Sequence, residues 1–83
     1  IALRLSGEFE EAETRLEKAL EIFEEIEASW QIGRTLYELG ELALVQTDGV
    51  AAHSYFMLAQ TRFEDLGAKP DIARTAKLLE NLN

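Results

Sequence analysis

The feature that most constrains the fold is a near-repetition of the sequence within this short chain. The motif IGRT at residues 32–35 returns as IART at residues 72–75. When residues 1–43 are aligned in the same register with residues 41–83, ten of the pairs are identical. This composition gives about four identities by chance, and most of the matches are apolar or small residues. We therefore interpret the pattern as an internal structural repeat.

The spacing of the apolar residues predicts that the repeating unit is helical. Two stripes step by three or four residues, which is the period of one face of an α-helix. The first comprises Ala12, Leu16, Ala19, Phe23 and Ile26 and returns as Ala52, Phe56, Ala59, Phe63 and Leu66. The second comprises Ile32, Leu36, Leu39 and Ala43 and returns as Ile72, Ala76 and Leu79. The sequence predicts an all-α fold without a β-sheet.

Breaks in these stripes divide the chain into helices. Gly7 is expected to separate two of them, Thr47 or Asp48 to cap another, and Gly67 to end it in a left-handed conformation. Pro70 suits the first turn of the next helix. We expect a single domain with the end of a first helix at residues 1–5 and a second helix at 8–27. A complete helical hairpin follows at 30–66 (helices 30–46 and 49–66), and the first helix of a next repeat at 70–81.

Composition excludes several classes of function. The net charge is −8 and cysteine is absent, so we expect no nucleic-acid or membrane partner and no thiolate metal site. His53 is the only histidine, and we interpret it as a surface residue; the many glutamates of residues 8–27 are interpreted as the solvated face of an amphipathic helix. We expect no catalytic residue, metal or cofactor. Because the chain opens at Ile1 without a methionine, we expect it to be a fragment of a longer protein.

Residues 36–43, LYELGELA, resemble the first-helix signature of tetratricopeptide repeats, with Leu36 and Leu39-Gly40 at its fixed positions. Ala52, Phe56 and Ala59 match the second-helix signature, and Gly40, Ala52 and Ala59 would let the backbones approach closely. The resemblance implies antiparallel hairpins stacked as a right-handed superhelix. The chain departs from the family in two ways: its period of 40 exceeds the usual length of about 34 residues, and the proline after the second helix is missing. A HEAT-like α-solenoid is the alternative.

Proteins of this family bind peptides or partner proteins in a concave groove lined by their first helices. The resemblance places eight residues on that groove: Arg4, Arg34, Tyr37, Glu41, Leu44, Arg74, Lys77 and Asn81. Four are basic and one is acidic, which favours an acidic peptide or a carboxylate as ligand. On this interpretation the Arg-Thr pairs that end the two motifs, at residues 34–35 and 74–75, lie outside the core. The alternative is that Arg34 merely pairs with Glu38 or Glu41 on its own helix.

The implied context is a cytoplasmic bacterial regulatory or signalling protein in which this segment is a non-catalytic interaction module. Two further alternatives remain at this stage. The segment could be a structural spacer, or a self-association module that forms a homodimer through its exposed helix ends. Trp30 is expected to be a packing residue at the hairpin junction rather than part of a ligand cage.

Overall fold

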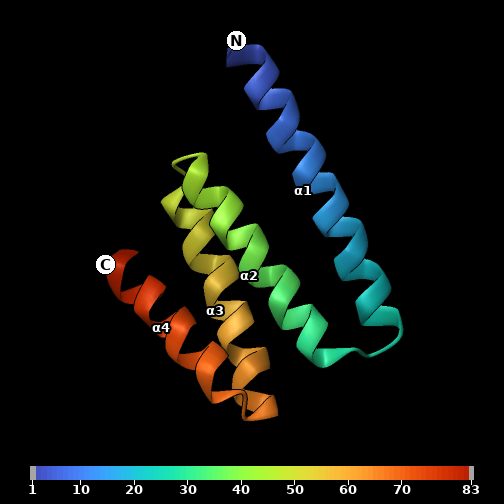
Figure 1. Cartoon of the computed structure of the whole chain (residues 1–83), viewed down its shortest axis with the longest axis vertical. Coiled ribbons are helices and arrows are strands. Elements are labelled where there is room, and N and C mark those ends of the chain that lie inside the picture. The colour runs from blue at the N-terminus through green and yellow to red at the C-terminus, as the bar shows by residue number, and fades with distance from the viewer. Residues whose placement is uncertain (1, 83) are drawn as a thin grey trace.

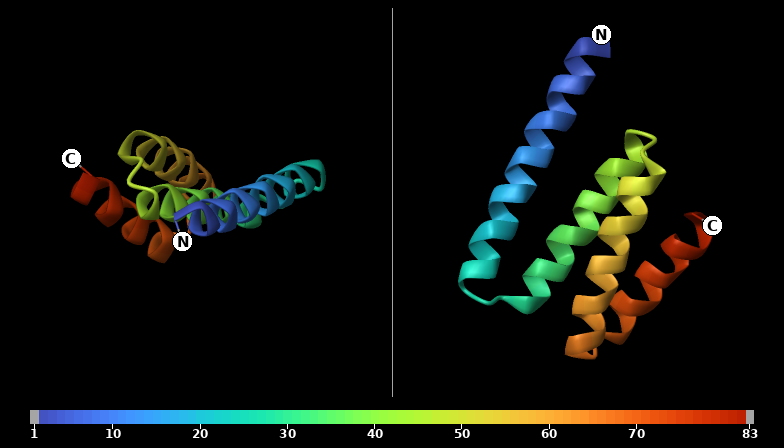
Figure 2. Two further views of the ribbon diagram at one scale, coloured as in Figure 1. Left: turned by 90° about the horizontal axis from the view of Figure 1, so that it is seen from above. Right: turned by 180° about the vertical axis from the view of Figure 1, so that it is seen from behind.

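The computed structural model describes the backbone of residues 2–82 and the side chains of residues 8–82. The described backbone forms four helices and no strand: α1 (Ala2–Glu25), α2 (Ser29–Val45), α3 (Gly49–Leu66) and α4 (Lys69–Leu82). Consecutive helices run in opposite directions and each packs on the next (Figure 1). Seen from above, α4, α2 and α1 form a shallow row with α3 on one side of it (Figure 2). The predicted all-α class is confirmed.

Helix α1 differs from the expectation at Gly7. The sequence predicted a break there, whereas one helix runs from Ala2 to Glu25. A glycine inside a helix costs about 1 kcal/mol relative to alanine, which weakens a helix but does not end it. The residues after Gly7 are rich in glutamate, which is a good helix former, and no proline follows until Pro70.

The three turns between the helices share one conformation and recur at a constant interval along the chain. Glu27, Thr47 and Gly67 each have a positive φ, of 54°, 60° and 69°. In each turn the next residue donates its backbone N–H to the carbonyl five residues back: Ala28 to Phe23, Asp48 to Ala43, and Ala68 to Phe63. This is the Schellman arrangement that closes helix C-termini. Each sequence repeat is therefore built from two helix-plus-turn units of equal length.

The core lies mainly between α2 and α3, where two glycines face two aromatic rings. A Cβ added to Gly40 would lie 2.5 Å from the Phe56 ring, and one added to Gly33 would lie 2.7 Å from the Phe63 ring. Both rings are almost fully buried. The glycines thus allow the close approach of the two helices, as the resemblance predicted for Gly40.

The threonines of the echoed motif belong to this core, contrary to the expectation. Thr35 and Thr75 are 4% and 0% exposed. Their hydroxyls donate to the backbone carbonyls of Gln31 and Asp71, four residues back, at 2.8 and 2.7 Å. A buried hydroxyl that is satisfied within its own helix costs little, so threonine can occupy a position where helices pack closely.

Helix α1 is held less tightly than the others. The apolar stripe from Ala12 to Phe23 is only half-buried, and Ile26 beyond it is exposed, as is its equivalent Leu66. The reason is that α1 packs mainly against α2, on one side only.

Within the described residues, none of the helices is long and apolar enough to cross a membrane.

Candidate interaction surface on helices α2 and α4

The candidate site is the polar face that α2 and α4 share, with Arg34 and Arg74 in equivalent positions of the repeat. Arg34 is half-buried and Arg74 is exposed. The charges of both arginines act on the Tyr37 hydroxyl, together with those of Glu41 and Asp71. The structure therefore brings Arg34, Tyr37, Glu41 and Arg74 of the predicted set into one neighbourhood.

Tyr37 was expected to be exposed on the lining of the groove, but it is only 7% exposed. Its ring packs against Phe56, with 5.5 Å between the centroids, and the Arg34 guanidinium carbon lies 5.5 Å from its centroid. Burial, followed by the Glu41 carboxylate, raises the pKa of the phenol above its usual value. Tyr37 acts as a neutral support for Arg34, whose cation interacts with the ring face.

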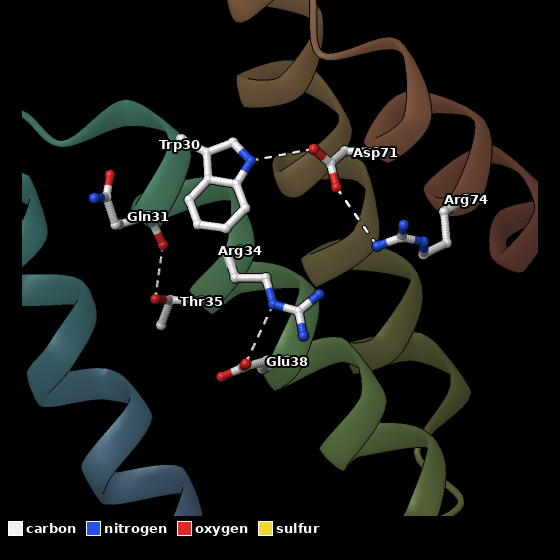
Figure 3. A network of polar contacts seen from close by, with 7 residues as sticks. All are labelled: Trp30, Gln31, Arg34, Thr35, Glu38, Asp71 and Arg74. Atoms are coloured by element: carbon white, nitrogen blue, oxygen red, sulfur yellow. Dashed lines mark hydrogen bonds and ion pairs between the residues drawn. The ribbon is translucent and has the colours of Figure 1, made fainter.

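A second group of contacts joins α2 to α4 (Figure 3). The Trp30 indole nitrogen donates to Asp71 Oδ2 at 3.1 Å, and the other oxygen of Asp71 lies 3.6 Å from Arg74 Nη1. Trp30 is 46% exposed, so it combines the expected junction role with a polar contact. Neither Trp30 nor Asp71 was predicted as a site residue. The repeat could have suggested this contact. It aligns Trp30 with Pro70, the residue before Asp71, so both Trp30 and Asp71 lie at the starts of equivalent helices.

Arg34 also forms an ion pair within its own helix, as the alternative to ligand binding predicted. Its Nε lies 3.4 Å from Glu38 Oε1, one turn along α2. Both arginines are therefore paired, but at 3.4 and 3.6 Å the pairs are longer than good charge-assisted hydrogen bonds. The Arg34–Glu38 pair, with both side chains 40% exposed, contributes about 0–1 kcal/mol. The guanidinium groups are held in place only weakly.

The remaining predicted residues are less closely connected. Lys77 and Asn81 are exposed, and Leu44 is half-buried against the core. Arg4 lies among residues 1–7, whose side chains are outside the described part of the structure. Asp71 and Glu38 add negative charge that the sequence prediction did not count. The described cations Arg34, Arg74 and Lys77 are balanced by the carboxylates of Glu38, Glu41 and Asp71, so the surface is less basic than expected.

The described residues contain no group of three histidine, cysteine, aspartate or glutamate side chains arranged to hold a metal ion. This surface presents two guanidinium groups, an indole N–H that is already engaged, and adjacent carboxylates. Guanidinium groups suit planar carboxylates, which they can contact through two parallel N–H donors.

Comparison with known proteins gives one structural relative. No protein-family model matches the chain, and no curated protein matches it either. The fold is similar to the solution NMR structure of a designed protein, DA05. The two share 28% sequence identity and a TM-score of 0.85, over 92% of this chain and 76% of that chain.

Proposed function

We propose that the chain is a non-catalytic protein-interaction module whose α2–α4 face binds an acidic peptide or a carboxylate of a partner protein. The observation that carries the proposal is the position of Arg34 over the buried Tyr37 ring, next to α4, whose Asp71 contacts both Trp30 and Arg74. Each arginine has one long ion pair within its own helix. A ligand carboxylate can replace Glu38 beside Arg34 at little cost, because both side chains of that pair are 40% exposed and such a pair contributes little.

We further propose that the helices form a right-handed superhelical segment of tetratricopeptide type, with a HEAT-like solenoid as the alternative. Support comes from the close packing of α2 on α3, where Gly33 lies opposite Phe63 and Gly40 lies opposite Phe56. The resemblance of residues 36–43 to the first-helix signature supports the same proposal. It implies a bacterial, cytoplasmic regulatory or signalling context.

Affinity capture from a lysate of the native host tests the binding face. The chain is compared with a variant carrying Arg34→Glu, Arg74→Glu and Lys77→Glu, after circular dichroism shows that both are helical. A second variant, Arg15→Glu with Lys18→Glu, changes exposed cations on α1 and is the matched control. We expect a partner that the chain and the α1 variant retain and the α2–α4 variant loses.

Two outcomes would contradict the proposal. A partner retained equally by all three proteins would bind elsewhere on the molecule. Recovery of the chain alone would favour the structural-spacer or homodimer alternatives.

A further inference from the structure

A second surface lies on the opposite side of α2, in a groove between α1 and α3. In Figure 1, α2 runs between these two helices. The groove has a volume of about 470 Å³, within the range of about 300–1,000 Å³ that is typical of binding pockets. Its apolar lining comes from all three helices: Leu20, Ile32, Leu36 and Leu58.

The groove and the α2–α4 face are separate. A residue on an α-helix is rotated by about 100° from the one before it. Arg34 is two positions from both Ile32 and Leu36, so it lies about 200° around α2 from these groove residues. A molecule bound in the groove therefore does not contact Arg34.

Leu58 gives the groove an accessible apolar contact. It lines the groove and is 54% exposed, whereas Ile32 and Leu36 beneath are 3% and 6% exposed. An incoming apolar side chain would cover Leu58 and rest on the core residues. An exposed apolar surface in a hollow with a polar rim is typical of a binding site.

The rim of the groove is acidic. Glu24 on α1 and Asp65 on α3 line it, with Arg62 as the one cation among its lining residues. Further along α3, burial raises the pKa of the Tyr55 phenol, and the carboxylates of Glu13 and Glu17 on α1 raise it further. Residues 8–25 of α1 carry eight glutamates against Arg15 and Lys18.

We infer that this groove binds an amphipathic helix of a partner protein, with leucine-like residues facing the groove and lysine or arginine along its edges. The apolar lining and the acidic rim together complement such a helix. A helix laid between α1 and α3 would also cover the half-buried side of α1. A second copy of this chain fits less well, because its net charge of −8 adds repulsion to the acidic rim.

The inference is tested with a short fluorescein-labelled peptide in which leucines recur every three or four positions and lysines occupy the remaining ones. Fluorescence anisotropy at physiological salt measures its binding to the intact chain. One control peptide has the same composition in an order without an apolar face. A second control has glutamate in place of lysine. We expect the amphipathic basic peptide to bind at least tenfold more tightly than either control.

Paired variants identify the binding site. Leu58→Ser and Asp65→Lys change groove residues, while Met57→Ser and Glu64→Lys change exposed neighbours outside the groove lining. We expect Leu58→Ser to weaken binding about tenfold or more, as for other interface residues at the centre of a contact. Asp65→Lys should weaken it as well, because it reverses a charge on the rim that attracts a basic peptide. The neighbouring variants should change it less than threefold. All four positions are exposed, so the variants are expected to remain folded.

Three results would overturn the inference. Equal binding of the shuffled peptide would show a non-specific charge effect, and equal effects of Leu58→Ser and Met57→Ser would place the peptide elsewhere. If sedimentation of the chain alone shows a dimer that Leu58→Ser dissociates, the groove holds a second copy instead of a basic helix.

Discussion

At the scale of single residues, the contact between Gly40 and the Phe56 ring determines how closely α2 and α3 approach. A side chain at residue 40 would meet a ring that is fully buried and has no free space into which to move. Gly33 and Phe63 form the same kind of contact elsewhere along the same two helices. Residue size at these positions, more than hydrophobicity, explains why the core can form.

We predict that Gly40→Ala lowers the free energy of unfolding by about 1–2 kcal/mol. Overpacking costs about 1–3 kcal/mol, which exceeds the gain of up to about 1 kcal/mol from replacing a helical glycine. Urea denaturation followed by circular dichroism measures the change. Gly49→Ala is the control, because a Cβ there has no neighbour within 4 Å. An equal response of the two variants would contradict the packing argument.

The two tyrosines predict a loss of stability at alkaline pH. Burial, followed by the carboxylates of Glu41 near Tyr37 and of Glu13 and Glu17 near Tyr55, raises the pKa of both phenols above 10.0. The fold therefore favours the neutral phenols. Their contribution is complete below about pH 10 and is lost as the pH rises through the folded pKa values.

Unfolding by urea at about pH 8 and about pH 11 checks this prediction. The chain should lose more stability over this interval than a variant with Tyr37→Phe and Tyr55→Phe. The comparison between the two proteins, not the total loss, decides the result. Identical losses would mean that the tyrosines do not contribute.

At the scale of helices and turns, the three Schellman turns explain the regular spacing of the fold. Only Gly67 has the residue type that favours a left-handed conformation; Glu27 and Thr47 adopt it at a cost. Asp48 then caps α3 by accepting a hydrogen bond from the Ala51 backbone N–H at 3.1 Å. The helices on either side and the Asp48 cap therefore hold this turn in place, although threonine does not favour a positive φ.

We predict that Thr47→Gly raises the free energy of unfolding by about 1 kcal/mol, because glycine adopts a positive φ without the steric penalty of a β-branched residue. Gly67→Ala, at the equivalent position, should lower it by a similar amount. Thermal unfolding followed by circular dichroism measures both. If Thr47→Gly were destabilising instead, the left-handed conformation at residue 47 would be in doubt.

The helical elements could be predicted from the sequence where the apolar period and the caps agree, as for α3 with Asp48 and Gly67. Gly7 was misleading because a glycine marks a helix end only when its φ is positive or a cap is present. Glu27 was missed as a turn residue, and Thr47 was predicted only as a possible cap, for the opposite reason: both adopt a positive φ although their residue types do not favour it. Turn conformation depends here on the packing of the helices on either side.

At the scale of the whole molecule, the repeat indicated which residues are equivalent but not which of them are buried by a neighbouring helix. Tyr37 and Thr35 were expected at the surface, and both are buried. Their helical positions lie at the edge of the core, where the neighbouring helix decides exposure. The pairing of Arg74 with Asp71 was likewise invisible in the stripe of apolar residues. The groove between α1 and α3 requires three helices and could not be predicted from one periodicity.

The most direct test of the proposed function is an NMR titration of the ¹⁵N-labelled chain with a hexaglutamate peptide. The indole N–H of Trp30, the only tryptophan, reports on the α2–α4 face through its hydrogen bond to Asp71. The proposal predicts saturable shifts of this signal and of the Arg34 and Arg74 resonances. The shifts should be absent from the Arg34→Glu, Arg74→Glu variant and retained when Arg15 and Lys18 are changed to glutamate. No shift with millimolar peptide, or the same shift in every variant, would contradict it.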